Sequence, residues 1–127
     1  MCIGYMSGGV ARQLADHYQR LEKEYNYYCE IYNKNYNYLK GKVFYFITDD
    51  EKVIANIFSQ EPNFNTDYEA LKIALLDIKR EAKSHKLSIC IPYGIGCGIA
   101  NGDWNKVYKI IEEVFNDYKV TLYKLED

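Results

Sequence analysis

Two glycine-containing segments are the parts of this sequence best suited to bind a ligand. Residues 4–9 read GYMSGG and residues 93–103 read YGIGCGIANGD, and each directly precedes a stretch with helical hydrophobic spacing. Glycine lets backbone N–H groups approach a ligand closely, and amides at the start of a helix favour phosphate without a Lys or Arg side chain. Because tight turns also need glycine, each segment alone is weak evidence. Together they predict a crevice that binds a diphosphate.

Neither segment matches a common nucleotide-binding motif. No Gly-Lys-Ser/Thr follows either one, as a Walker A motif requires, and neither is a full GxGxxG string that opens a helix. The sequence therefore argues against an ordinary nucleoside triphosphatase or dehydrogenase.

The cysteines, histidines and one aspartate are the other residues that could do chemistry. The irregularly spaced cysteines and the two histidines are Cys2, Cys29, Cys90, Cys97, His17 and His85. This spacing does not predict a zinc site, so the cysteines are expected to be small buried thiols, His17 a surface residue and His85 a helix C-terminal cation. Asp103, in the second glycine-rich segment, is the candidate general base, but Asp at a helix start is also a common N-cap, and capping is the favoured role.

Hydrophobic spacing predicts the helices and strands that position these residues. Apolar residues at steps of three and four predict helices over residues 10–28 and 104–115. A third helix is predicted from Thr66, where a capping box begins, to about His85. Short β-branched and aromatic runs predict strands at residues 42–48, 53–59, 87–92 and 120–125, the first two as a hairpin or an adjacent pair, with a loop at residues 33–41. The order predicts an α/β fold whose second half is a strand, a crossover helix and a parallel strand. Ligands in such sheets bind beyond the carboxyl ends of the strands.

Composition narrows the class of protein. The chain has 127 residues, 48% hydrophobic and 27% charged, which predicts one globular domain over residues 1–127. Its net charge of -2 argues against a general nucleic-acid or anionic-membrane binder. No apolar run approaches the roughly 20 residues that span a bilayer, and the first residues do not match a signal peptide, so a cytoplasmic location is expected.

Three strings resemble the macrodomain family, in particular small bacterial and phage members that process ADP-ribose derivatives. They are residues 4–14 (GYMSGGVARQL), 53–60 (VIANIFSQ) and 88–115 (SICIPYGIGCGIANGDWNKVYKIIEEVF). The last is the most specific, with a strand that ends in proline, an IGCG loop, an Asp-Trp pair and a helix. The resemblance implies a three-layer α/β/α mixed sheet and an ADP-ribose ligand.

The resemblance also implies which residues bind the ligand. The first loop would hold the phosphates and distal ribose through its amides, and the second loop would clamp the diphosphate, with Cys97 supplying an amide and not a thiolate. Tyr93 would stack on a ribose or the adenine, or else pack in the core, and Gln60 would hydrogen-bond the ligand or lie on the surface. The ligand-binding set is Met6, Ser7, Gly8, Gly9, Val10, Ala11, Gln60, Tyr93, Ile95, Gly96, Cys97, Gly98 and Ile99. No metal or cofactor is implied.

The chain also departs from the family pattern. It starts where the second family strand should finish, so one or two strands, with their Gly-Asp pair and asparagine, are expected to be absent, and the shortened edge would favour a homodimer. Family members similar to the terminal ADP-ribose glycohydrolases use a lysine after the strand that resembles residues 42–48 and an acid just after the IGCG loop. This chain has Asp49 near the first position and Ala100 at the second. A lysine-adduct mechanism is therefore not supported.

The sequence leaves two main functions open. The first is a macrodomain that binds ADP-ribose or a derivative, with hydrolysis of ADP-ribose 1''-phosphate or of ADP-ribosyl groups as its activity if it is an enzyme. The alternative is a degenerate macrodomain-like module with a structural or interaction role. A remote third, a small oxidoreductase, would need a reactive thiol at Cys90 or Cys97.

Overall fold

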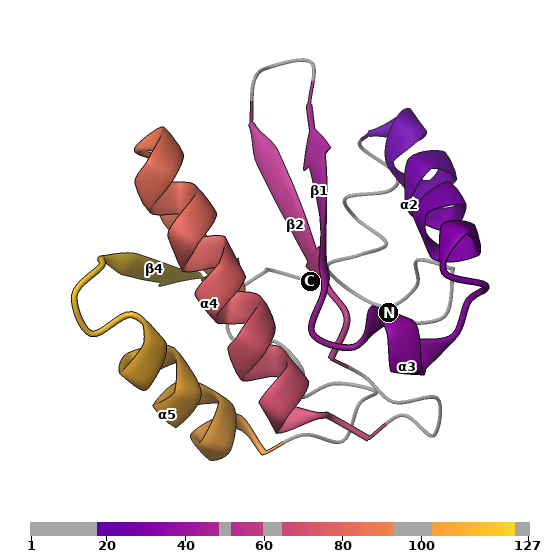
Figure 1. Cartoon of the computed structure of the whole chain (residues 1–127). Coiled ribbons are helices and arrows are strands. Elements are labelled where there is room, and N and C mark those ends of the chain that lie inside the picture. Colours follow the sequence, from indigo (N-terminus) through magenta and orange to yellow (C-terminus); the bar gives the residue numbers. More distant parts are fainter. Residues whose placement is uncertain (1–17, 49–51, 60–64, 93–102, 124–127) are drawn as a thin grey trace.

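The structure is a computed structural model that describes residues 18–48, 52–59, 65–92 and 103–123. Its elements, in chain order, are α2 (Gln19–Ile31), α3 (Tyr36–Leu39), β1 (Val43–Ile47), β2 (Val53–Ile57), α4 (Tyr68–His85), β3 (Ile89–Pro92), α5 (Trp104–Val114) and β4 (Val120–Tyr123) (Figure 1). The predicted α/β class is confirmed.

The described strands form two pairs. β1 and β2 are antiparallel, with a register that runs from Val43 opposite Ile57 to Ile47 opposite Val53. β3 and β4 are parallel and are joined through α5, as expected for a strand, crossover helix and strand. Both predicted pairings are confirmed.

Two predictions near the start of the described chain are wrong. The helix expected over residues 10–28 does not run through Tyr18, because Tyr18 has an extended backbone, with φ -116° and ψ 97°, and is the N-cap of α2. The centres of the Tyr18 and Phe46 rings are 6.2 Å apart. Tyr18 therefore fits the helical spacing of the sequence but packs against the core from a position before the helix. Residues 10–17, and with them His17, lie outside the described residues.

The loop expected at residues 33–41 contains the short helix α3. The side chain of Asn35 accepts a hydrogen bond from the Asn37 N–H and caps it, and Tyr36 and Leu39 are buried. With only two buried residues, α3 is too short to give a periodic signal in the sequence.

The predicted bounds of α4 are nearly correct, but its cap is a different residue. Asp67, and not Thr66, is the N-cap, and its carboxylate accepts a hydrogen bond from the Ala70 N–H. Ala70 then occupies the position where a capping box needs Glu or Gln, so no reciprocal bond forms. The helix ends at His85 as predicted, and Lys86 follows in a left-handed conformation with φ 56°.

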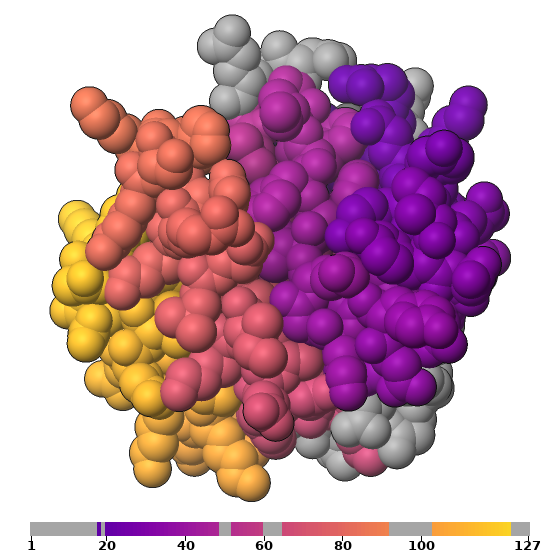
Figure 2. All heavy atoms as spheres, viewed as in Figure 1, coloured from indigo at the N-terminus to yellow at the C-terminus, as the bar shows by residue number. Residues whose placement is uncertain are grey.

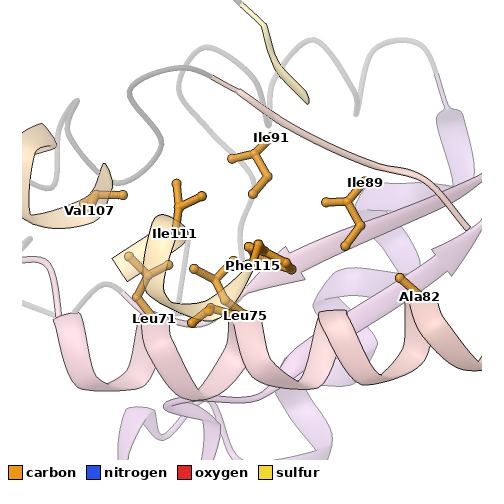
Figure 3. Packing of buried hydrophobic residues seen from close by; sticks show 9 residues of the cluster. Leu71, Leu75, Ala82, Ile89, Ile91, Val107, Ile111 and Phe115 are labelled. Atoms are coloured by element: carbon orange, nitrogen blue, oxygen red, sulfur yellow. The ribbon is translucent and has the colours of Figure 1, made fainter. Parts of the chain in front are cut away.

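Two apolar clusters hold the elements together. One contains Leu21, Tyr25, Cys29, Tyr36, Leu39, Phe44, Phe46 and Phe58, and so joins α2 and α3 to one face of β1. The other contains Leu71, Leu75, Ala82, Ile89, Ile91, Val107, Ile111, Val114 and Phe115, which point toward one another between α4, α5 and β3 (Figure 3).

The two described cysteines differ in exposure. Cys29 is fully buried, as predicted, but Cys90 is exposed. The prediction fails for Cys90 because side chains alternate along a strand: Ile89 and Ile91 enter the cluster with α4 and α5, so Cys90 faces the opposite side. In the described part of the chain no helix could span a membrane.

Candidate functional site

At one end of the fold, the ends of two strands meet the starts of two helices. The Asp67 N–H donates a hydrogen bond of 2.6 Å to the carbonyl of Ser59, which ties the start of α4 to the residues that follow β2. β3 ends at Pro92, and residues 93–102 lead from there to Asp103 at the start of α5. Figure 1 shows α4 and α5 beginning at the same end of the molecule. This is the arrangement that places a ligand beyond strand ends in an α/β fold.

Tyr68 connects the starts of the two helices. Its hydroxyl accepts a hydrogen bond of 2.8 Å from the Asp103 N–H, and the ammonium of the exposed Lys106 lies 5.4 Å from the centre of its ring. From its spacing, the sequence places Tyr68 on the apolar face of α4, and its ring does pack against the second cluster. The hydroxyl contact was missed, because it joins residues 35 positions apart.

Both helices carry an aspartate N-cap. One oxygen of Asp67 accepts from the Ala70 N–H at 3.0 Å and the other from the Tyr36 hydroxyl at 2.8 Å. Asp103 accepts from the Asn105 N–H at 2.9 Å. The favoured capping role of Asp103 is therefore present, and its role as a general base stays a prediction.

The ligand-binding residues expected from the sequence lie outside the described residues. They are Met6, Ser7, Gly8, Gly9, Val10, Ala11, Gln60, Tyr93, Ile95, Gly96, Cys97, Gly98 and Ile99. The structure does describe three positions that adjoin them in the chain, namely Ser59, Pro92 and Asp103. Ser59 and Pro92 lie at or just after the ends of β2 and β3, and Asp103 is the N-cap of α5.

Described residues line at least two hollows. One, of about 660 Å³, lies beside the start of α4 and is lined by Asn33, Lys34, Asn35, Tyr36, Asn37, Lys40 and Asp67. The other, of about 480 Å³, lies between α2, the start of β1 and α4. Neither contains a described residue that the sequence assigns to the ligand.

Several side chains around the second hollow, away from the starts of α4 and α5, have shifted pKa values. The Tyr45 hydroxyl donates a hydrogen bond of 2.6 Å to Asp77, which also contacts Arg80. Burial, and then this bond, raise the pKa of Tyr45, whereas for Asp77 the bonds from Tyr45 and Arg80 outweigh burial and lower the pKa. Burial and the neighbouring Tyr32 raise the pKa of Tyr28 to about 12. These groups stay in their usual charge states near neutral pH, which is typical of structural contacts.

No group of metal-ligating side chains occurs within the described ranges.

Comparison of the sequence with protein families gives no matching family model. A curated relative, an ADP-ribose 1''-phosphate phosphatase of Saccharomyces cerevisiae, is 28% identical over 154 aligned positions, which cover 98% of this chain and 85% of that protein.

Solved structures resemble the whole described architecture. The macrodomain of Mycobacterium tuberculosis DarG aligns with a TM-score of 0.82 at 22% identity, covering 98% of this chain and 84% of that one. A macrodomain protein from Streptomyces coelicolor aligns with a TM-score of 0.81 at 20% identity, covering 98% and 82%. The sequence and structural similarities agree with the motifs in the sequence, and the chain has the macrodomain fold.

Proposed function

We propose that this chain binds ADP-ribose or a closely related diphosphate at the end of the fold where α4 and α5 begin. The observation that carries the proposal is the hydrogen bond between Tyr68 and Asp103, because it brings the starts of both helices together beside the ends of β2 and β3. The names of the relatives support the ligand, since one is an ADP-ribose 1''-phosphate phosphatase and others are macrodomains.

The aspartate caps restrict how a diphosphate can be held. Asp67 and Asp103 place carboxylates on the first amides of α4 and α5, and a carboxylate there repels an incoming anion while it occupies the donors. The ligand therefore takes its hydrogen bonds from backbone amides of the glycine-containing segments. This mode suits a chain with a net charge of -2.

Hydrolysis of ADP-ribose 1''-phosphate or of ADP-ribosyl groups is the activity that this site would have as an enzyme. For that activity Asp103 is the candidate to orient or deprotonate the attacking water, and capping is its favoured role. The alternative is a non-catalytic interaction module, and the cap that Asp103 forms favours it, because a carboxylate held by the Asn105 N–H already has a structural role.

Isothermal titration of the chain with ADP-ribose tests the proposal, with AMP and ribose 5-phosphate as controls. We expect a Kd on the order of micromolar for ADP-ribose and much weaker binding of the two fragments. Gly96→Glu should abolish binding by blocking the second loop. Ser84→Glu adds the same charge at the exposed far end of α4 and should leave binding unchanged.

The result against the proposal is a folded chain that does not bind ADP-ribose, which would favour the interaction module. Where binding occurs, release of phosphate from ADP-ribose 1''-phosphate separates a binding module from a phosphatase.

A further inference from the structure

The hollow beside the start of α4 is polar and joins two elements that are far apart in the sequence. Its volume is about 660 Å³, and its lining includes Asn33, Lys34, Asn35, Asn37 and Lys40 from the turns on either side of α3. The hydrogen bond from the Tyr36 hydroxyl to Asp67 ties this part of the chain to α4. Figure 2 shows the purple atoms of α2 and α3 directly beside the salmon atoms of α4. The hollow is therefore built by packed elements and not by one loop alone.

Most side-chain donors in this hollow are not used within the described fold. Lys34 and Lys40 are exposed, and neither ammonium has an ion-pair partner among the described residues. The side-chain NH2 groups of Asn33, Asn35 and Asn37 make no hydrogen bond within the described ranges. All five groups can therefore donate to a ligand.

The side-chain acceptors of the hollow, in contrast, are largely occupied. One oxygen of Asp67 accepts from the Ala70 N–H at 3.0 Å and the other from the Tyr36 hydroxyl at 2.8 Å. The side-chain oxygen of Asn35 accepts from the Asn37 N–H at 2.9 Å. An excess of free donors favours a ligand that is rich in acceptors. Two ammonium charges against one carboxylate charge favour an anion.

Lys34 has a backbone conformation that glycine would adopt with less strain. Asn33 and Lys34 follow α2 with φ of 55° and 52°. Asparagine is common in this left-handed region, but lysine is not. Because Lys34 is exposed, packing of its side chain in the core does not offset the strain. Strained residues cluster at ligand contacts, and a contact made by the Lys34 ammonium would explain why lysine occupies this position.

We propose that the hollow binds a phosphate group through the ammonium groups of Lys34 and Lys40 and the side-chain amides of the three asparagines. A phosphate monoester offers acceptor oxygens and a negative charge, and its hydrogen bonds with ammonium groups are of the strong, charge-assisted kind. The hollow is larger than one phosphate, so the group is expected to belong to a larger molecule or to leave room for water. Binding here uses side chains, whereas the crevice proposed for ADP-ribose uses backbone amides.

The phosphate has two possible sources, and the proposal holds for both. One is free phosphate. The other is the terminal phosphate of an ADP-ribose 1''-phosphate whose diphosphate lies in the crevice, because Asp67 lines the hollow and the next residue, Tyr68, contacts Asp103 at the start of α5. Only the second source rests on the proposed function.

Backbone amide shifts measured by NMR on the full chain test the proposal. Inorganic phosphate is the probe, and chloride at equal ionic strength is the reference. We expect the amides of residues 33–37 to shift with phosphate and not with chloride, with a Kd on the order of 1 mM. Since the shifts are assigned to single residues, phosphate that also enters the crevice does not obscure this result.

Two exposed lysines with the same backbone conformation give a matched pair of variants. Lys34→Gly removes an ammonium from the hollow, and Lys86→Gly removes one from the end of α4, where φ is 56°. Neither should lower Tm, because glycine adopts positive φ without strain. Lys34→Gly should weaken phosphate binding about fivefold and Lys86→Gly less than about twofold. Lys40→Gln should also weaken binding, and it tests the hollow if Lys34→Gly does not fold.

A second titration distinguishes the two sources. If the hollow holds the terminal phosphate of a ligand in the crevice, ADP-ribose 1''-phosphate should shift residues 33–37 at a lower concentration than inorganic phosphate does, and Gly96→Glu should remove this difference. If it holds free phosphate, both should act at similar concentrations and Gly96→Glu should change neither. A chain that fails to bind ADP-ribose in calorimetry would still show the shift with inorganic phosphate.

Three results would overturn the proposal. One is that residues 33–37 do not shift with phosphate, or shift equally with chloride. Another is that Lys34→Gly and Lys86→Gly weaken phosphate binding equally. The third is that ADP-ribose, which has no 1''-phosphate, displaces inorganic phosphate from residues 33–37, which would make the hollow a part of the crevice.

Discussion

Substitution of Asp103 separates its capping role from a catalytic one. The Asp103 carboxylate accepts a hydrogen bond of 2.9 Å from the Asn105 N–H, and the side chain is exposed. Asp103→Ala removes this cap and should cost about 1 kcal/mol of unfolding free energy, or a fall in Tm of about 4 °C for a chain of this size. Asp103→Asn keeps an acceptor oxygen in the same place and should cost only a few tenths of a kcal/mol.

The two substitutions differ in their effect on chemistry. An amide cannot take a proton from water, so loss of a general base would lower turnover by about 10² to 10⁴ in both variants. We expect Asp103 to act as a cap, so that Asp103→Asn retains the stability, the ADP-ribose affinity and any phosphatase turnover of the parent chain. Urea unfolding, titration calorimetry and phosphate release measure the three quantities.

Either of two outcomes would refute this reasoning. A folded Asp103→Asn variant whose turnover falls about a hundredfold would make Asp103 the base. An Asp103→Ala variant as stable as the parent would show that the cap contributes nothing.

Five further substitutions test the fold. Gly41→Ala should lower the unfolding free energy by at least about 1 kcal/mol in urea, because Gly41 has φ 79° and an added Cβ would lie 3.2 Å from an α4 side chain. Asn56→Leu should raise it by about 1 kcal/mol, because the buried Asn56 amide nitrogen has no hydrogen-bond partner; an unchanged urea midpoint would contradict this. Hydrogen bonds from two α4 lysines lower the pKa of Asp117 to about 2 from 3.8. A carboxyl group whose pKa is lower in the folded chain than in the unfolded chain stabilises the fold when it is ionised. The contribution of Asp117 is therefore complete above pH 3.8 and is lost as the pH falls toward 2. Asp117→Asn should make Tm fall less steeply between these two pH values. Cys90→Ser should remove one thiol that reacts in the native chain, and Cys29→Ser should remove none, because only the first is exposed.

Much of the fold follows from regular patterns in the sequence. Short β-branched and aromatic runs predict that β1 and β2 are neighbours, and the order of strand, helix and strand over residues 89–123 predicts the parallel pair. The long helix α4 ends at its predicted residue, His85. These predictions succeed because each depends on periodicity within one element or on the chirality of one connection.

The remaining differences depend on contacts between distant residues. Tyr18 fits the helical spacing, but packs on Phe46 from an extended backbone. Asp67 rather than Thr66 caps α4, because its second oxygen also accepts from the Tyr36 hydroxyl, 31 residues away. No local pattern contains such a contact, so the sequence predicts the elements better than their exact ends.

At the candidate site, too, the sequence predicts local features but not the contacts between distant residues, and this difference affects the chemistry of the site. Glycine content marks the segments that are proposed to bind the ligand, but the bond from Asp103 to Tyr68 brings the starts of α4 and α5 together. Both Asp67 oxygens, one oxygen of Asp103 and the Tyr68 hydroxyl already accept hydrogen bonds within the fold. These side chains therefore build the frame of the site, and a diphosphate bound there must obtain its donors mainly from the backbone of the two segments. Recognition of this kind depends on loop conformation more than on any one charged side chain, which explains how a nearly neutral chain can be expected to bind an anion.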